Sequence, residues 1–145
     1  MAIGFSKEDM ANLLITAWEG GSNYWVDYAD YKPPKGMTLK ELRKAAWEAA
    51  PEKEKDLWKD EGPEGRWPLY SLLPFLPPSV KWKIEFRPQE EEESVFLTPE
   101  NMREAAQKLV ETHPSIFARI KEGDYDAGDA DVWLQTALFN EVVYG

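Results

Sequence analysis

One segment restricts the fold of this chain more than any other. Five prolines fall between residues 62 and 78, and they interrupt a run of large apolar side chains (Trp67, Leu69, Tyr70, Leu72, Leu73, Phe75 and Leu76). Proline has no amide hydrogen to donate and a fixed φ, so the segment cannot form a regular helix or a central strand. Its apolar side chains still have to be removed from water. We therefore expect an irregular strap that covers the core, with a lid or an oligomer interface as the functional alternative.

The first helix is predicted by a cap and by apolar spacing. Ser6 followed by Asp9 resembles a capping box, and apolar residues then recur at helical spacing over residues 7–19. Gly20 and Gly21 are expected to end this helix, because glycine adopts the left-handed conformation of a helix C-terminus without steric cost.

A second helix and an extension of it are predicted before the strap. A capping box at Thr38 opens the helix, which is expected to end before Pro51. Residues 52–61 are expected to add a helical turn or two that carry Leu57 and Trp58 inward.

Three more helices are predicted near the C-terminus. Residues 98–100 combine a Thr cap, a proline at the first helical position and an acid, which together start a helix. His113 and the proline after it break that helix, and Gly123 ends the short helix that follows. A last helix over residues 130–139 is expected to be buried nearly all round.

Alternation of apolar and polar residues predicts the strands. The clearest strand covers residues 80–86, and a turn at residues 88–93 joins it to a short partner strand at residues 95–97. Residues 142–144 are expected to add a short edge strand. An earlier strand at residues 24–29 is expected to place Tyr24, Val26 and Tyr28 on one face and Trp25, Asp27 and Ala29 on the other.

The order of these elements sets the fold class. A helix, a strand, a helix, the strap, a hairpin and three helices do not form the alternation that is typical of a parallel sheet. We expect an α+β fold in which a small, mostly antiparallel sheet of about three to four strands packs against several helices. Residues 1–145 are expected to form a single domain.

Composition indicates whether the chain can form a core and in which cellular compartment it is expected. The chain has 145 residues, of which 43% are hydrophobic and seven are Trp, so it has enough apolar surface for one core. It has no Cys, and therefore no disulfide and no thiolate nucleophile, which fits a reducing cytoplasm. Its apolar stretches are shorter than the roughly 20 residues of a membrane span. We expect a protein in the cytoplasm of a host cell, with no membrane partner.

Net charge argues against one class of partner. The chain has 27 acidic and 17 basic side chains, which gives a formal net charge of −10. Direct binding of nucleic acid through its phosphates needs clustered basic charge and is therefore not expected. The acidity would suit docking onto a basic surface, or it serves only to keep the protein in solution.

Catalytic and metal-binding patterns do not stand out, and we expect neither an enzyme nor a cofactor. Asp124, Asp126, Asp129 and Asp131 fall within eight residues, but the spacing lacks the glycine and the glutamate that an EF-hand loop requires. Asp126 or Asp129 is expected to cap the last helix. His113 is the single histidine and precedes a proline at a helix end, where we expect it to contact exposed carbonyl groups.

The segment between the first helix and the first strand is the most site-like part of the sequence. Its two glycines leave backbone amides uncovered, its serine and asparagine offer hydrogen bonds, and its two aromatic rings can stack on a planar ligand. The segment is less suited to bind a phosphate, because it follows the C-terminal end of a helix, which carries a negative partial charge. The structural alternative is a helix stop with aromatic residues in the core. The expected ligand-binding residues are Gly20, Gly21, Ser22, Asn23, Tyr24 and Trp25.

Two blocks of sequence resemble a group of known proteins. One is residues 15–25, which end in Glu-Gly-Gly-Ser-Asn-Tyr-Trp, and the other is residues 129–145, Asp-Ala-Asp-Val-Trp-Leu-Gln-Thr-Ala-Leu-Phe-Asn-Glu-Val-Val-Tyr-Gly. They resemble the ends of small proteins encoded by phages and plasmids, which also have a helix start like Thr98-Pro99. The resemblance implies an origin and carries no residue roles. By analogy with other small phage accessory proteins, it implies action against host defence.

Two functions from different classes follow from these features. The first is a non-enzymatic phage accessory protein, as a homo-oligomer, that binds and sequesters a small nucleotide-like signal. Basic side chains would neutralise its phosphate, such as Arg66, Lys81, Lys83 or Arg87. The second is an acidic protein inhibitor that mimics nucleic acid or blocks a basic groove of a host defence enzyme, through residues 90–93 and 124–131. An enzyme is the least favoured function.

Overall fold

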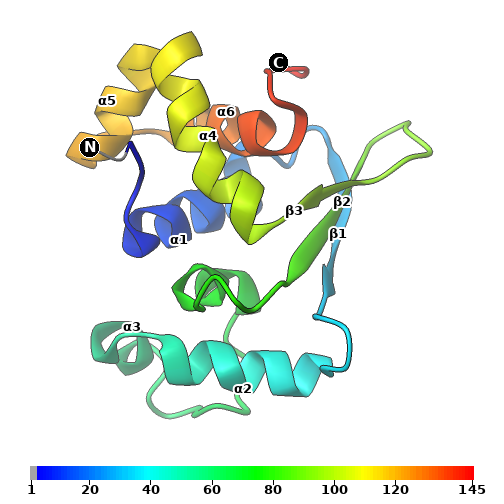
Figure 1. The fold of residues 1–145 in the computed structure, drawn as a ribbon, viewed down its shortest axis with the longest axis vertical. Coiled ribbons are helices and arrows are strands. Elements are labelled where there is room, and N and C mark those ends of the chain that lie inside the picture. Colours follow the sequence, from blue (N-terminus) through cyan, green and yellow to red (C-terminus); the bar gives the residue numbers. More distant parts are fainter. Residues whose placement is uncertain (1–2) are drawn as a thin grey trace.

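Three antiparallel strands and a set of helices form the fold of residues 3–145, the part of the chain that the computed structural model describes (Figure 1). The strands are β1 (Val26–Lys32), β2 (Lys83–Pro88) and β3 (Val95–Leu97). The helices are α1 (Lys7–Thr16), α2 (Leu39–Ala49), α3 (Glu52–Asp56), α4 (Pro99–Thr112), α5 (Pro114–Glu122) and α6 (Ala127–Phe139). Shorter helical segments are the π-helix η1 (Ala17–Gly21) and the 3-10 turns η2 (Leu69–Ser71) and η3 (Leu73–Phe75). The predicted α+β fold with a small antiparallel sheet is confirmed.

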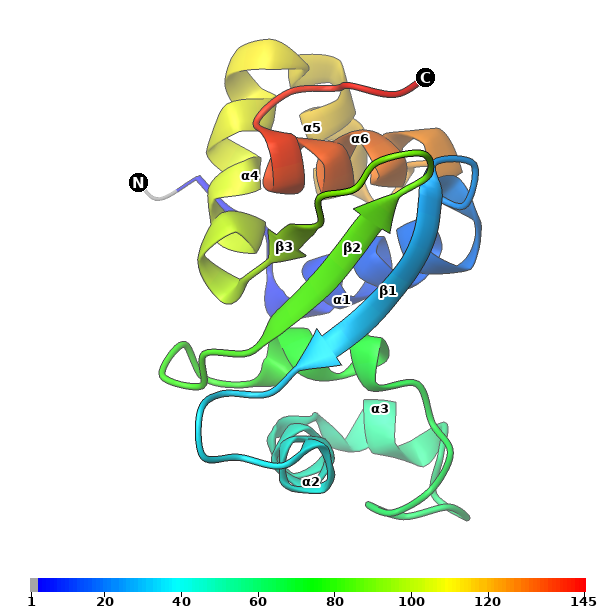
Figure 2. The same ribbon diagram turned by 90° about the vertical axis from the view of Figure 1, so that its right-hand side faces the viewer.

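The sheet has the strand order β1-β2-β3, and both strand pairs are antiparallel. β2 and β3 form the predicted hairpin, whereas the chain between β1 and β2 contains α2, α3 and the strap. Figure 2 shows the sheet in front and α1 and α6 behind it. Ile84 and Phe86 point from β2 into the protein and are buried. Helices therefore cover the inner face of the sheet, and its outer face is open to solvent.

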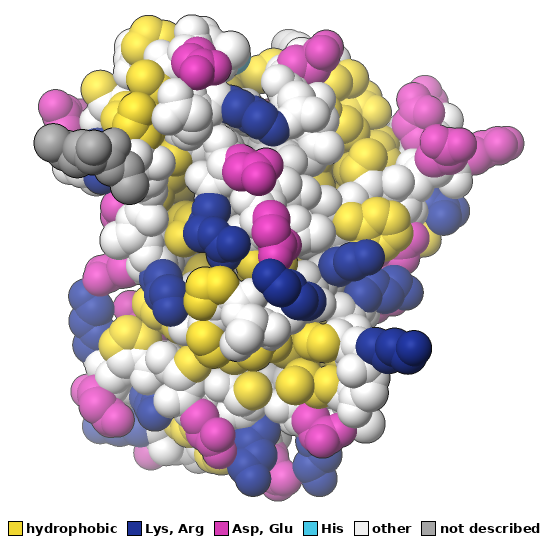
Figure 3. All heavy atoms as spheres, viewed as in Figure 1, with side chains coloured by type: hydrophobic (Ala, Val, Ile, Leu, Met, Phe, Trp, Pro, Cys, Tyr) yellow, Lys and Arg dark blue, Asp and Glu magenta, His cyan; other side chains and the backbone are white. Residues whose placement is uncertain are grey.

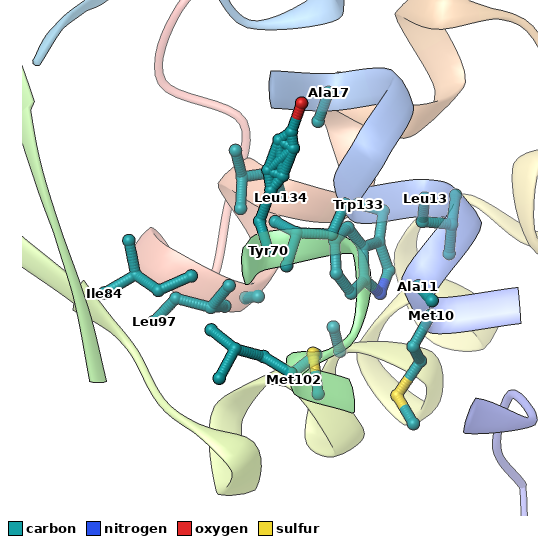
Figure 4. Close-up of a cluster of buried hydrophobic side chains, with 14 of the residues drawn as sticks. Met10, Ala11, Leu13, Ala17, Tyr70, Ile84, Leu97, Met102, Trp133 and Leu134 are labelled. Carbon is teal, nitrogen blue, oxygen red and sulfur yellow. The ribbon is translucent and has the colours of Figure 1, made fainter. Parts of the chain in front are cut away.

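The core lies where α1, α4, α6 and the sheet meet (Figure 4). Trp133 and Leu134 of α6 and Leu13 of α1 are fully buried there. Burial of one large apolar side chain contributes about 1.5–3 kcal/mol to stability. The prediction that the last helix is buried nearly all round is confirmed, because eight of its residues between Asp129 and Ala137 are buried.

Residues 62–78 form the predicted irregular strap. All seven of its large apolar side chains named above are buried. The turns η2 and η3 pack against α1, and η3 also contacts α2, so the strap lies between these two helices (Figure 1). The guanidinium of Arg43 in α2 donates hydrogen bonds to the carbonyl oxygens of Gly65 (2.6 Å) and Trp67 (2.9 Å). These bonds satisfy backbone groups that an irregular segment leaves without partners.

The helical run ends at Gly21, close to the expected stop, but the expected left-handed glycine cap is wrong. The chain continues past α1 as η1, and Ser22 is the C-cap residue. Neither glycine has the positive φ of a left-handed cap. Gly21 is needed for a different reason, since a Cβ atom there would overlap the carbonyl oxygen of Ala127 in α6. Its missing side chain lets η1 approach α6 closely.

The first strand begins later than predicted, and its side chains alternate between the two faces in a different way. β1 begins at Val26, and a β-bulge lies between Val26 and Tyr28. A bulge inserts one unpaired residue and so shifts the alternation of the faces. As a result Val26 packs against the core, as Ala29 and Tyr31 do beyond the bulge, whereas Tyr24 and Tyr28 are 53% and 41% exposed. The expected grouping of Tyr24, Val26 and Tyr28 on one face is wrong.

Three smaller expectations also fail. Leu57, expected to point inward, is 72% exposed because α3 already ends at Asp56, although Trp58 packs partly against the core. Residues 142–144 are not a strand. β2 begins at Lys83 and not at Val80. In the described part of the chain, the helices are too short or too polar to cross a membrane.

Candidate functional site

The turn between η1 and β1 directs its side chains toward α6. The amide of Ser22 donates to the carbonyl of Ala17 (2.9 Å), and the amide of Val26 donates to the carbonyl of Ser22 (3.1 Å). These bonds make the turn compact. Ser22 and Trp25 consequently lie inside the protein at 1% and 2% exposure, whereas Tyr24 is 53% exposed.

The carboxylate of Asp131 in α6 accepts hydrogen bonds from this turn. Its Oδ1 atom accepts from the hydroxyl of Ser22 and from the indole nitrogen of Trp25, both at 2.7 Å. Its Oδ2 atom accepts from the hydroxyl of Tyr24 (2.6 Å) and from Nε2 of Gln135 (2.9 Å). Hydrogen bonds to an ionised acceptor are about twice as strong as bonds between neutral groups. We call these five residues the Asp131 cluster.

Gln135 connects this cluster to the C-terminal tail. Its Oε1 atom accepts from the amides of Val143 and Tyr144, both at 2.8 Å. Its Nε2 atom also donates to the carbonyl of Tyr144 (3.1 Å). A buried side chain therefore binds backbone groups that the predicted edge strand would have bound in a sheet. This is why the tail turns toward α6 after Asn140, which ends the helix in the left-handed conformation.

Aromatic rings surround the buried indole. Tyr144 stacks on Trp25 with ring centroids 5.1 Å apart and planes at 8°. Phe139 meets both rings edge-on, with centroid distances of 5.6 Å to Trp25 and 5.8 Å to Tyr144. Such pairs contribute about 0.5–1.5 kcal/mol beyond the area that they bury. The tail is thus held by packing as well as by hydrogen bonds.

A pocket of about 680 Å³ opens beside the cluster, and we call it the Asp131 pocket. The hairpin between β2 and β3 supplies one wall, since the amide of Gln89 donates to the carbonyl of Trp25 (2.7 Å) and Glu90 follows it. Sites for small molecules have volumes of about 300–1,000 Å³ and combine aromatic walls with a few polar groups. The lining residues are Gly21, Tyr24, Trp25, Gln89, Glu90, Gly128, Asp131, Tyr144 and Gly145.

The charged groups of the Asp131 pocket are acidic. Glu90 and Asp131 line it, and its lining residues include no Lys, Arg or His. Burial of its hydroxyl, followed by the hydrogen bond to Asp131 and the charge of Asp131, raises the pKa of Tyr24 to about 12. Tyr24 is therefore neutral at physiological pH and remains a hydrogen-bond donor.

The residues predicted from the sequence have different places in this arrangement. Gly21, Tyr24 and Trp25 line the Asp131 pocket, and Ser22 is buried against Asp131. Asn23 lines a neighbouring pocket of about 230 Å³, and Gly20 lines neither pocket. The structural alternative, aromatic residues in the core, holds for Trp25. Ligand binding by this segment stays a prediction.

Sequence reasoning missed Asp131, Gln135 and Tyr144. A signal was present, because Asp131 and Gln135 are four residues apart and so share one face of a helix that is rich in apolar residues. Polar side chains on a buried face need hydrogen-bond partners. Two segments far apart in the sequence meet here, since residues 15–25 contain the turn and residues 129–145 contain its partners.

Other acids near Asp131 have structural roles. The Oδ1 atom of Asp126 accepts from the amide of Asp129 (2.8 Å), so the predicted cap of the last helix is confirmed. The carboxylate of Asp129 accepts two hydrogen bonds from Arg119, at 2.8 and 2.7 Å, and this contact lowers the pKa of Asp129. Within residues 3–145, no three His, Cys, Asp or Glu side chains are grouped as metal ligands would be.

His113 lies apart from the Asp131 pocket, between α4 and α5. Its backbone amide donates to the carbonyl of Leu109 (2.7 Å), and its Nδ1 atom lies 3.0 Å from the hydroxyl of Thr112. The backbone of His113, and not its ring, therefore meets the last carbonyls of α4.

Comparison with known proteins does not assign a family. A scan against protein-family models, a search of curated proteins and a search of solved structures find no match to this chain.

Proposed function

We propose that this chain is a non-enzymatic binding protein that holds a small planar molecule in the Asp131 pocket. The observation that carries the proposal is the pocket itself, in which three aromatic side chains and a buried carboxylate meet at an opening of about 680 Å³. Aromatic walls give contact area to a flat ligand, and Asp131 and Tyr24 supply groups that fix its orientation.

Sequestration of a host signal is the role that we propose for this binding. Binding alone lowers the free concentration of a signal, so no turnover is required. The resemblance to phage and plasmid proteins favours a role against host defence. The residues that line the pocket do not include the basic side chains that were expected to neutralise a phosphate, namely Arg66, Lys81, Lys83 and Arg87. The pocket therefore favours the flat part of a nucleotide-like molecule over its phosphate.

Thermal-shift screening tests this proposal. Nucleosides, nucleotides and other planar signals would be added to the purified protein, and small molecules released by denaturing it would be identified by mass spectrometry. Binding to the native state alone raises the melting temperature, and the increase grows with the ratio of the free ligand concentration to Kd. We expect at least one planar ligand to stabilise the wild type and the Tyr28→Ala variant but not Tyr24→Ala. Tyr28 is a matched control because it is exposed on the outer face of the sheet.

Two results would count against the proposal. One is a flat response across the panel together with no released ligand. The other is equal stabilisation of Tyr24→Ala and Tyr28→Ala, since the ligand would then bind outside the Asp131 pocket.

A second candidate function is an acidic inhibitor that docks onto a basic groove. It is favoured by Glu90, Glu91, Glu92 and Glu93, which are all exposed at the tip of the β2–β3 hairpin. Figure 3 shows acidic side chains projecting from the molecule at this tip. The second expected acidic centre contributes less, because Asp129 and Asp131 are buried and bound to other groups.

Salt dependence tests this second function. An inhibitor that acts through the hairpin tip should bind its target less tightly as salt increases, because salt screens exposed charges. Replacing Glu91, Glu92 and Glu93 by Lys should abolish the complex and leave binding to the Asp131 pocket unchanged. A complex that is insensitive to salt and to these replacements would contradict this function.

A further inference from the structure

We infer that the Asp131 pocket selects a planar organic cation over neutral or anionic molecules of the same shape. This inference rests on the binding function proposed above and names the class of ligand. It follows from the charges that line the pocket, from its aromatic rings and from the position of Glu90.

Among the residues that the structure describes, the negative charge of Asp131 is not paired with a cation. Asp131 is 5% exposed, and the four groups that donate hydrogen bonds to its carboxylate are neutral groups of Ser22, Tyr24, Trp25 and Gln135. Neutral donors stabilise the carboxylate, but they do not cancel its charge. The pocket therefore presents a negative potential, which attracts a positive ligand more strongly in a partly buried site than in open water.

The aromatic rings of the pocket also favour a cation. Tyr24, Trp25 and Tyr144 line the same pocket. The face of an aromatic ring is negative, so it attracts a cation that lies within about 6 Å of its centre. Trp25 and Tyr144 already stack on each other, so a flat ligand would lie against Tyr24 and the outer side of this pair. Carboxylates combined with aromatic faces are the usual protein surroundings of an organic cation.

Glu90 is the third element. It follows Gln89, whose amide is bonded to the carbonyl of Trp25, so the hairpin is fixed at the edge of the pocket. The side chain of Glu90 is exposed and lines the pocket, whereas Glu91, Glu92 and Glu93 are exposed without lining it. Glu90 therefore offers a second carboxylate that a cation can pair with, and Glu92 is a matched control.

Matched pairs of probes test the inference. At mildly acid pH, 7-methylguanosine is a cation that differs from the neutral nucleoside guanosine by one methyl group and one positive charge. Benzamidine is a cation and benzamide is its neutral counterpart of similar shape. Binding would be measured by tryptophan fluorescence and by calorimetry. We expect each cation to bind at least about tenfold more tightly than its neutral partner, a difference of about 1.4 kcal/mol. The Glu90→Gln variant should reduce this preference, while Glu92→Gln should keep it.

The outcomes separate the two proposals. If the neutral members bind as tightly as the cations, or if Glu90→Gln and Glu92→Gln behave alike, the cation inference is overturned while the binding function stands. If no probe binds and no ligand is released from the purified protein, both are overturned.

Discussion

Trp25 and Asp131 are 106 residues apart in the sequence and are joined by a hydrogen bond of 2.7 Å from the indole nitrogen to Oδ1. The same carboxylate holds Ser22 and Tyr24 from the turn before β1. It therefore fixes α6 to the N-terminal part of the chain and shapes one wall of the Asp131 pocket.

Asp131→Asn should destabilise the protein strongly. Asparagine has one acceptor oxygen and one donor amide, so some of the four donors around Asp131 would lose their acceptor. Loss of charge-assisted bonds and burial of unpaired donors should lower the free energy of unfolding by about 2–4 kcal/mol. Urea denaturation measures this change, with the exposed Asp124→Asn as control. Equal stability of the two variants would contradict the assigned role of Asp131.

Gly21→Ala and Gly20→Ala should have opposite effects. A Cβ atom at Gly21 meets the carbonyl of Ala127, a backbone atom that cannot turn aside, so Gly21→Ala should cost about 1–3 kcal/mol. Gly20 has no atom within 4 Å of its added Cβ, and its φ is not positive, so Gly20→Ala should be neutral or stabilising by about 0.4–1 kcal/mol. Thermal denaturation of both variants gives the comparison. Similar effects at both positions would show that the contact between η1 and α6 is not the reason for Gly21.

The sequence predicted the elements of this fold better than it predicted their junctions. Caps at Thr38, Thr98 and Asp126 are local signals, because the hydrogen bonds that they make lie within four residues. The strap was predictable because proline and apolar side chains leave few alternatives. The bulge in β1 and the π-helix η1 were not, since both depend on contacts with distant segments.

The candidate site was predicted only on its N-terminal side. Tyr24 and Trp25 were expected because their residue types suit a ligand. Asp131, Gln135 and Tyr144 approach them only through the tertiary fold, and the acids around Asp131 were explained by helix capping alone. Capping was correct for Asp126 and could not reveal that Asp131, five residues later in the chain, binds the opposite end of the sequence.

Acid should remove the contribution that Asp129 makes to the stability of the folded protein. Arg119 holds the pKa of Asp129 below its usual value, so the unfolded chain takes up a proton at higher pH than the folded protein does. The stabilisation is therefore present above about pH 4, the unfolded pKa of Asp, and is lost as pH falls through the lower folded value. Asp129→Asn should be less stable than wild type by about 1–2 kcal/mol at pH 7, with a difference that shrinks below about pH 4. Melting curves from pH 7 to pH 2.5 test this, and a constant difference would contradict it.

Tyr24 should lose its hydroxyl proton at a higher pH than an ordinary tyrosine does. Its pKa is raised to about 12, first by burial and then by Asp131, so the folded protein holds this proton more tightly than the unfolded chain does. The stabilisation is present below about pH 10, the unfolded pKa of Tyr, and is lost as pH rises toward 12. Tyrosinate absorbance would be measured against pH in the wild type and in Tyr24→Phe, and the difference between the two curves gives the ionisation of Tyr24. A difference curve with its midpoint near pH 10 would show that Tyr24 is not bonded to Asp131.

The most direct test of ligand binding at the Asp131 pocket is a nuclear magnetic resonance titration of the ¹⁵N-labelled protein with 7-methylguanosine, with guanosine as the matched neutral probe. We expect saturable shifts in the indole signal of Trp25 and in the amides of Gly21, Glu90 and Gly145, all of which line the pocket, while the indole signal of Trp67 stays in place. Signals of the pocket that remain unmoved by either probe, or shifts confined to residues elsewhere, would contradict the account.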